Sequence, residues 1–252
     1  MFFRIIACEI ALREICHLAA RSKHLLDLDF LTQGHHENPN AGRADIQERI
    51  NAIPEGKYDA ILLGYGLCSN ILTGLKASHT PLVVPRAHDC ITFFLGSKER
   101  YREMFDSHPG TYYYTSGWLE CPRRRGKEMS EIAQSFLPTS NQETSNADYE
   151  KWVAKYGEEQ AQYLLQEMNR WADAYSYGTL IDFDFARDLD LPAQVKNVCA
   201  HRGWEYAEVK GDLGLLDRWL EGDWNSEAFL VVKPGESIVA THDGGIVGAV
   251  AS

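Results

Sequence analysis

The sequence lacks any long hydrophobic segment. Its 252 residues contain no apolar run that approaches the roughly 20 residues of a membrane-spanning helix. The N-terminus also lacks a signal-peptide pattern, because Glu9 and Arg13 interrupt its apolar residues. These two absences predict a cytoplasmic protein that does not act at a membrane.

Basic residues are scarce as well. The chain has 25 Lys and Arg against 36 Asp and Glu, a formal net charge of -11. Nucleic acids and anionic membrane surfaces are bound through clustered Lys and Arg, so neither is an expected partner. The one short basic run, Arg123-Arg124-Arg125, is interpreted as a solvated loop. A small-molecule substrate is the partner that remains.

Two motifs of cofactor-binding proteins are missing. No Cys-x-x-Cys pair occurs among the six cysteines, so the spacing of a zinc knuckle is absent. Gly64-x-Gly66 is too short for a dinucleotide fingerprint, and no nucleotide is predicted. Disulfides are rare in the cytosol, so the cysteines are core, metal-binding or catalytic residues.

Alternating strand and helix patterns fill the first third of the chain. Apolar strands are predicted at residues 2–7, 25–31 and 60–63, with helices at 9–21 and 43–53 between them. This order predicts a parallel sheet with right-handed crossovers. A fourth strand, 81–85, precedes a helix from about residue 91.

The last third has the same order. Strands are expected at 178–183, 204–209 and 227–232, with helices at 192–201 and 213–220. We therefore predict an α/β protein with Rossmann-like parallel sheets in two similar β-α-β-α-β lobes around a cleft. The expected division is an N-terminal lobe at 1–121, a polar excursion with long helices at 122–176, and a C-terminal lobe at 177–252.

Cysteines stand at the ends of three predicted strands. Cys8 follows the first strand, Cys68 the third and Cys90 the fourth. Carboxyl ends of parallel strands share one sheet edge, where α/β proteins bind ligands. Thiolates are soft ligands, and three of them leave a fourth position open, so Zn²⁺ is the expected cofactor and a [4Fe-4S] cluster the alternative. His88 would be a fourth ligand or a proton carrier.

Two other interpretations of these cysteines stay open. They are ordinary small residues at crowded strand ends, or one of them, Cys90 or Cys68, is a metal-free nucleophile activated by His88 and a helix N-terminus. Cys16 and Cys199 lie among apolar neighbours on predicted helices and are interpreted as core residues. Cys121 has no assigned role.

Charged residues beside Cys90 extend the candidate site. Arg86, at a strand end, would bind an anionic group of the substrate, with a salt bridge to Asp89 or Glu120 as the alternative. Asp89 precedes the helix at Ile91 and is a helix cap or a catalytic base.

Aromatic and loop residues complete the candidate site. Tyr65, Tyr114 and Trp118 would form the walls of the cleft, although core packing explains them nearly as well. The loop amides at Ser69 and Asn70 would hold part of the substrate. The adjacent His35 and His36 are interpreted first as exposed loop residues and only second as ligands.

Several strings of residues together resemble one known family. They are Tyr58–Asn70, Pro85–Thr92, Leu95–Tyr101, Pro109–Tyr112 and Gly117–Trp118. In this order they resemble the DUF1638 family of bacterial and archaeal proteins over roughly the first half of the chain. Cys8, Cys68, His88 and Cys90 then fall at the family's motif positions. The family's function is undefined, but its association with corrinoid-dependent one-carbon metabolism implies a role near methyl transfer and a corrinoid protein as a partner.

The sequence thus predicts a metal-thiolate enzyme, a transferase or lyase acting on a small anionic metabolite. The rival prediction is a non-catalytic protein that binds a metal, corrinoid or metabolite and hands it on. The two differ in whether the thiols support turnover.

Overall fold

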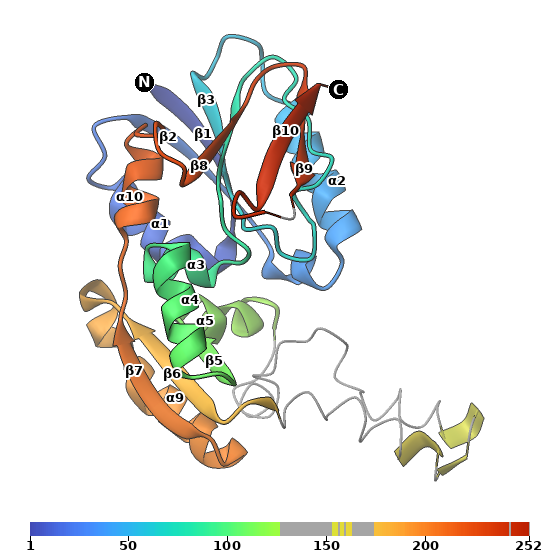
Figure 1. Cartoon of the computed structure of the whole chain (residues 1–252), viewed down its shortest axis with the longest axis vertical. Coiled ribbons are helices and arrows are strands. Elements are labelled where there is room, and N and C mark those ends of the chain that lie inside the picture. The colour runs from blue at the N-terminus through green and yellow to red at the C-terminus, as the bar shows by residue number, and fades with distance from the viewer. Residues whose placement is uncertain (127–152, 156, 159, 163–173, 242, 252) are drawn as a thin grey trace.

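Two separate sheets organise the chain. In the computed structural model, which describes residues 1–126, 153–155, 157–158, 160–162, 174–241 and 243–251, a five-stranded sheet lies above a three-stranded one (Figure 1). The larger sheet has the order β2-β1-β3-β4-β8. Its strands are β1 (Phe2–Cys8), β2 (Leu25–Leu31), β3 (Ala60–Gly64), β4 (Leu82–Pro85) and β8 (Phe229–Val232).

The first four strands of the larger sheet are parallel, which confirms the expected α/β class. Helix α1 (Leu12–Ala19) packs on one face of this sheet and α2 (Pro39–Asn51) on the other. Their apolar side chains belong to two different hydrophobic cores, one on each face. Side chains of β1 alternate between those cores, with Ile5 in one and Ile6 in the other. Short helical turns, η1 (Glu9–Ala11) and η2 (Gln33–His36), follow β1 and β2.

The strand predicted at 227–232 is present as β8, but its placement in a separate C-terminal lobe is wrong. It pairs antiparallel with β4 of the larger sheet, with Pro85 opposite Phe229. A short run of apolar residues fits any buried strand, so its composition does not identify its sheet. Helix α10 (Gly214–Leu220), just before β8, packs against α1. Its Trp219 is fully buried in the core on that face.

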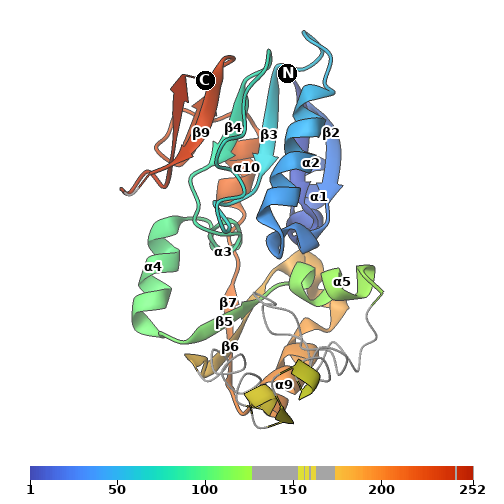
Figure 2. The same ribbon diagram turned by 90° about the vertical axis from the view of Figure 1, so that its right-hand side faces the viewer.

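The smaller sheet is parallel throughout and has the order β5-β6-β7. Its strands are β5 (Thr111–Tyr114), β6 (Tyr177–Asp182) and β7 (Glu205–Lys210), and α9 (Leu191–Arg202) packs on β6 and β7. Because β5 comes from the predicted N-terminal lobe, the sheets are not two copies of one β-α-β-α-β unit. The chain enters this sheet through α3 (Ile91–Leu95) and α4 (Lys98–Ser107), as Figure 2 shows.

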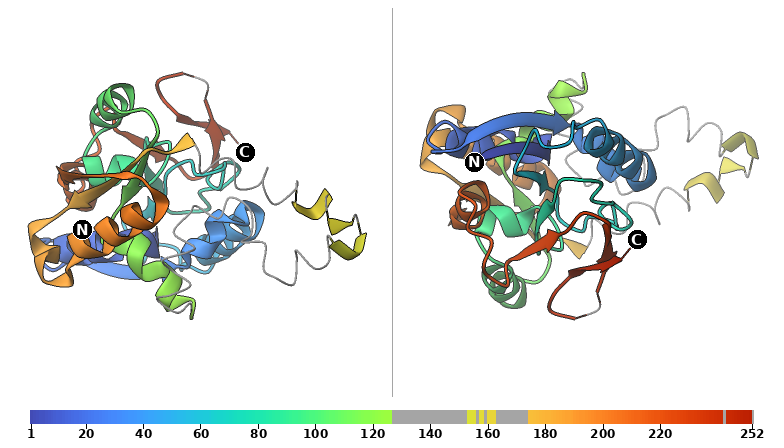
Figure 3. Two further views of the ribbon diagram at one scale, coloured as in Figure 1. Left: turned by 90° about the horizontal axis from the view of Figure 1, so that it is seen from below. Right: turned by 90° about the horizontal axis from the view of Figure 1, so that it is seen from above.

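Three elements complete the described fold. Helix α5 (Ser116–Arg124) follows β5 and includes Arg123 and Arg124, which were expected in a loop, and the turn η4 (Asp184–Leu189) follows β6. The antiparallel hairpin β9 (Glu236–Ala240) and β10 (Val247–Ala251) lies at the edge of the larger sheet opposite β2 (Figure 3). Ile238 and Val247 of this hairpin enter the same core as α2.

Most of the polar excursion and helices predicted for 122–176 lies outside the described residues. Within the part of the chain that is described, no helix is both long and apolar enough to cross a membrane.

Candidate functional site

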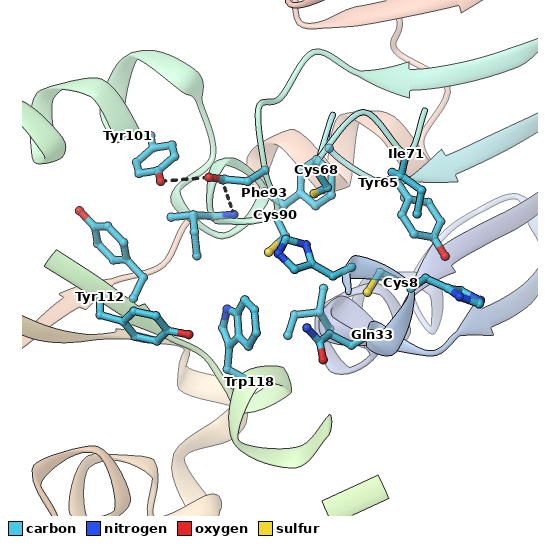
Figure 4. Close-up of a pocket in the computed structure, with 18 of the residues that line it drawn as sticks. Cys8, Gln33, Tyr65, Cys68, Ile71, Cys90, Phe93, Tyr101, Tyr112 and Trp118 are labelled. Atoms are coloured by element: carbon cyan, nitrogen blue, oxygen red, sulfur yellow. Dashed lines mark hydrogen bonds between the residues drawn. The ribbon is translucent and has the colours of Figure 1, made fainter. Parts of the chain in front are cut away.

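The three strand-end cysteines line a single cavity of about 200 Å³. Cys8 ends β1, Cys68 lies in the loop after β3, and Cys90 directly precedes α3 after β4. These strands are neighbours, and the chain reverses its direction across the sheet between β1 and β3. Such a switch point leaves a crevice at the carboxyl ends of the strands. Figure 4 shows Cys8, Cys68 and Cys90 around this cavity, with Tyr112 and Trp118 from the second sheet's side.

Two loops pack tightly to form the sheet side of the cavity. A Cβ atom on Gly66 would lie 2.7 Å from the Cα atom of Asp89, so only glycine fits there. The Cys68 amide donates a hydrogen bond of 2.9 Å to the His88 carbonyl. The loops that carry Cys68 and Cys90 are therefore held together by their backbones.

The loop after β3 has an unusual backbone. Cys68, Ser69 and Asn70 have φ values of 35°, 54° and 66°, in the left-handed region that side chains other than glycine rarely adopt. Each such residue costs roughly 1–2 kcal/mol. The amide of Ile71 closes the turn on the Leu67 carbonyl at 3.0 Å. A strained turn therefore directs Cys68, while Ser69 and Asn70 are exposed.

Burial keeps the cavity thiols protonated in the metal-free chain. It raises the pKa of Cys8 and of Cys68 to about 12, and that of Cys90 well above its ordinary value. Each thiolate would also repel the others. A metal-free nucleophile needs a lowered thiol pKa, so this direction counts against that interpretation.

Aromatic rings form much of the remaining wall. Of the predicted wall residues, Tyr65 and Trp118 line the cavity, whereas Tyr114 is fully buried in the core and does not. Trp118 reaches it because Gly117, at the start of α5, lies against η1: a Cβ atom there would be 1.8 Å from the Ile10 carbonyl oxygen. The sequence does not predict the other aromatic residues that line the cavity. They are Phe93, Tyr101, Tyr112, Tyr113 and Tyr175.

Asp89 also lines the cavity. Its Oδ1 accepts a hydrogen bond of 3.0 Å from the Ile91 amide, at the start of α3, and its Oδ2 accepts one of 3.0 Å from the Tyr101 hydroxyl (Figure 4). Burial raises the pKa of Asp89, and these hydrogen bonds oppose the rise. The carboxyl group of Asp89 therefore accepts a hydrogen bond at the start of α3, as a helix cap would, and also lines the cavity.

Four further predicted site residues are not brought to the cavity wall. Ser69, Asn70 and His88 are exposed and do not line it. Arg86 donates from Nε to the Phe229 carbonyl at 3.3 Å, and from Nη1 to the carbonyls of Gly245, at 2.7 Å, and Val247. Arg86 thus joins β4 to β8 and the C-terminal hairpin.

His35 is a cavity residue that the sequence analysis placed in an exposed loop. Its Nε2 lies 3.0 Å from Asp45 Oδ2, and Arg49 Nε donates to Asp45 Oδ1 at 3.0 Å. Arg49 also bonds Asp29 at 2.8 Å. Gly42 on α2 allows the close approach, since a Cβ atom there would lie 2.7 Å from His35 Cβ. The imidazole is therefore held in one orientation at the cavity.

The thiols have the right chemistry for a soft metal but are not preassembled around one. Among the described residues, no three His, Cys, Asp or Glu side chains are grouped closely enough to hold a metal ion as they stand. Cys8, Cys68 and Cys90 share a cavity and the donor type that zinc and iron–sulfur clusters prefer. Metal binding would require the three sulfur atoms to move closer together.

Comparison with known proteins gives one match. No curated protein and no solved structure matches this chain. Residues 30–220 match the family described as "Protein of unknown function (DUF1638)". The matched region extends well past the first half and includes Cys68 and Cys90 but not Cys8. The chain belongs to the DUF1638 family.

Proposed function

We propose that this protein is an enzyme that converts a small metabolite in the cysteine-lined cavity, next to a metal held by Cys8, Cys68 and Cys90. One observation carries the proposal: three thiols from three neighbouring strand ends line the same buried cavity. Zn²⁺ is the first choice, and a [4Fe-4S] cluster with one open iron is the alternative. When bound, the metal would supply Lewis acidity or, for a cluster, an open iron for the substrate.

The chain's own residues would position the substrate and move protons. His35, oriented by Asp45, is the best-placed proton carrier, in place of the exposed His88. Asp89 is a second candidate, because burial raises its pKa and it lines the cavity. Trp118 and the tyrosines would exclude water. A transferase or lyase reaction, and the link to corrinoid-dependent methyl transfer, are proposals that rest on the family resemblance.

The proposed substrate differs in charge from the sequence-based expectation. An anionic metabolite was expected from Arg86, but its hydrogen bonds to three carbonyls hold it at the C-terminal hairpin. The described lining residues include no Lys or Arg. An uncharged or cationic metabolite suits this lining better.

A second candidate is a non-catalytic metabolite-binding protein. The observation that favours it is the absence, among the described residues, of a preassembled group of three metal ligands. A cavity that never holds a metal would bind its metabolite and release it unchanged.

Metal analysis separates the two candidates. Metal content, acid-labile sulfide and the visible spectrum are measured on anaerobically purified protein and on Cys68→Ala. Cys16→Ala is the matched control, because Cys16 is half-buried on α1 and does not line the cavity. About one zinc ion per chain, or iron with sulfide, lost in Cys68→Ala and kept in Cys16→Ala, supports the enzyme. Reduced thiols with no metal in the wild type would overturn the metal centre.

A further inference from the structure

Asp89 places a carboxylate in the cavity, whereas the neighbouring His88, whose charge would lower the pKa of Asp89, is exposed and does not line the cavity. Its two described hydrogen-bond donors, the Ile91 amide and the Tyr101 hydroxyl, are both uncharged. No described Lys or Arg lines the cavity or forms an ion pair with Asp89. A buried carboxylate needs hydrogen bonds and an opposite charge to offset the loss of hydration. The cavity supplies only the first of these.

The imidazoles of the lining do not supply the missing charge. His35 and His36 are the remaining basic side chains among the described lining residues. His35 already has Asp45 as its partner, 3.0 Å away. His36 lies on η2, after β2, whereas Asp89 follows β4, which is separated from β2 by β1 and β3. A bound ligand is therefore the natural source of a positive charge beside Asp89.

The aromatic lining is suited to such a ligand. The rings of Tyr112 and Tyr175 have centroids 5.5 Å apart and planes at 81°, and those of Tyr112 and Trp118 are 6.4 Å apart at 57°. These are contact distances between neighbouring rings, so the three side chains form one packed aromatic wall of the cavity. The face of an aromatic ring attracts a cation, most strongly for tryptophan. Methyl groups on nitrogen spread the charge over an apolar surface that fits these rings.

Other ligand classes fit the same wall less well. An anionic ligand would meet Asp89 with no described Lys or Arg to offset the repulsion. A neutral apolar ligand would fill the aromatic part but leave the carboxylate without a counter-charge and with less water. The overall charge of -11 also favours the approach of cations.

We propose that the cavity binds a small organic cation of the methylated ammonium class, held against the aromatic wall of Trp118, Tyr112 and Tyr175 with Asp89 as its counter-charge. This inference names the substrate class of the proposed function and rests on it for the location of the site. It does not depend on which metal, if any, the thiols bind.

A matched pair of probes tests the proposal. Choline and 3,3-dimethylbutan-1-ol have the same shape, but carbon replaces the charged nitrogen in the second. Isothermal titration of each into the full-length protein measures the effect of that charge alone. Choline is expected to bind at least about tenfold more tightly than the alcohol. Equal binding of the two probes, or binding of neither, would overturn the proposal.

Variants assign the preference to the named residues. Asp89→Asn keeps the side chain's shape and is expected to bring the two affinities close together, because only choline loses a partner. Asp106→Asn, an exposed carboxylate on α4, is expected to keep the wild-type ratio. Trp118→Leu should weaken choline more than Trp118→Phe does. If folded Asp89→Asn keeps the wild-type ratio of choline to alcohol affinity, Asp89 is not the counter-charge. If that variant does not fold, the ratio measured for the wild type decides whether the cavity prefers a cation.

Metal content is measured on the same samples, so the two proposals fail separately. A metal-free protein that prefers choline supports the ligand class and overturns the metal centre. A metal-containing protein that binds both probes equally overturns the ligand class alone.

Discussion

Ser116 Oγ donates a hydrogen bond of 3.2 Å to Glu14 Oε1, and this contact joins α1 on the larger sheet to α5 beside the smaller one. Glu14 is fully buried, and its Oε2 atom has no hydrogen-bond partner. Burial is the main cause that raises the pKa of Glu14, from about 4.5 to about 7. The junction between the two sheets therefore contains a carboxyl group whose protonated form is favoured by burial.

This contact predicts a pH-dependent stability. Between pH 4.5 and 7 the folded chain keeps a proton on Glu14 that the unfolded chain has lost. The stabilising effect of that proton is complete below about pH 4.5 and is lost as the pH rises through about 7. At pH 8, Glu14→Gln should be more stable than the wild type by roughly 2–3 kcal/mol. Urea denaturation at pH 5 and pH 8 measures the difference.

Glu103→Gln, an exposed carboxylate on α4, is the control and should keep the wild-type profile. Glu14→Gln with an undiminished loss of stability between pH 5 and 8 would show that Glu14 does not cause it.

Gly66→Ala should damage the cysteine loops. The new methyl group would lie 2.7–2.9 Å from three backbone atoms of Asp89, and a backbone cannot move aside as a flexible side chain can. We expect a loss of about 1–3 kcal/mol in the free energy of unfolding, together with weaker binding in the cavity. Gly244→Ala is the control, because nothing lies within 4 Å of the corresponding position. Similar stability of the two variants would mean that the loops do not need this close approach.

Arg86→Ala should loosen the C-terminal hairpin and spare the cavity. It removes hydrogen bonds to three carbonyls in or just before β8 and β10, worth about 1–3 kcal/mol in total. Hydrogen exchange of residues 236–251 should become faster while metal content and probe affinity stay at wild-type values. A selective loss of probe affinity with unchanged exchange would restore the interpretation of Arg86 as a substrate-binding residue.

Asp45→Asn should release the orientation of His35. In the folded chain Asp45 Oδ2 accepts a hydrogen bond from His35 Nε2. The contact therefore favours the neutral tautomer with the proton on Nε2, in which Nδ1 is the acceptor. The variant weakens that preference, and ¹⁵N chemical shifts of the ring report the two tautomers. Asp106→Asn should leave the shifts unchanged. A His35 ring with identical shifts in wild type and Asp45→Asn would exclude Asp45 as the orienting group.

The four parallel strands of the larger sheet were predictable because β1, β3 and β4 are mainly apolar and β2 alternates apolar and acidic residues. Ala60–Gly64 is buried along its whole length, as a central parallel strand requires. The placement of β8 was not predictable, because the four residues Phe229–Val232 carry no signal for the direction or the partner of the strand. Pairing with β4 depends on contacts between residues far apart in the sequence.

The candidate site was predictable where local order determines it. Cys8, Cys68 and Cys90 follow strands, so the sheet itself brings them to one edge. Tyr112 and Tyr175 come from different segments and reach the cavity only through the packing of the smaller sheet. Arg86 was misplaced for the same reason, since its partners lie in β8 and near the C-terminal hairpin. Single-sequence patterns do not contain these long-range contacts.

The pairing of β4 with β8 also affects synthesis at the ribosome. The three strands of the smaller sheet, β5, β6 and β7, are made after β4 and before β8. The emerging chain therefore holds four parallel strands with an open edge at β4 until Phe229 follows. Open strand edges pair with other chains, and contacts over long sequence separations form slowly. Nascent chains halted before residue 229 should accordingly be the species that most needs chaperone protection.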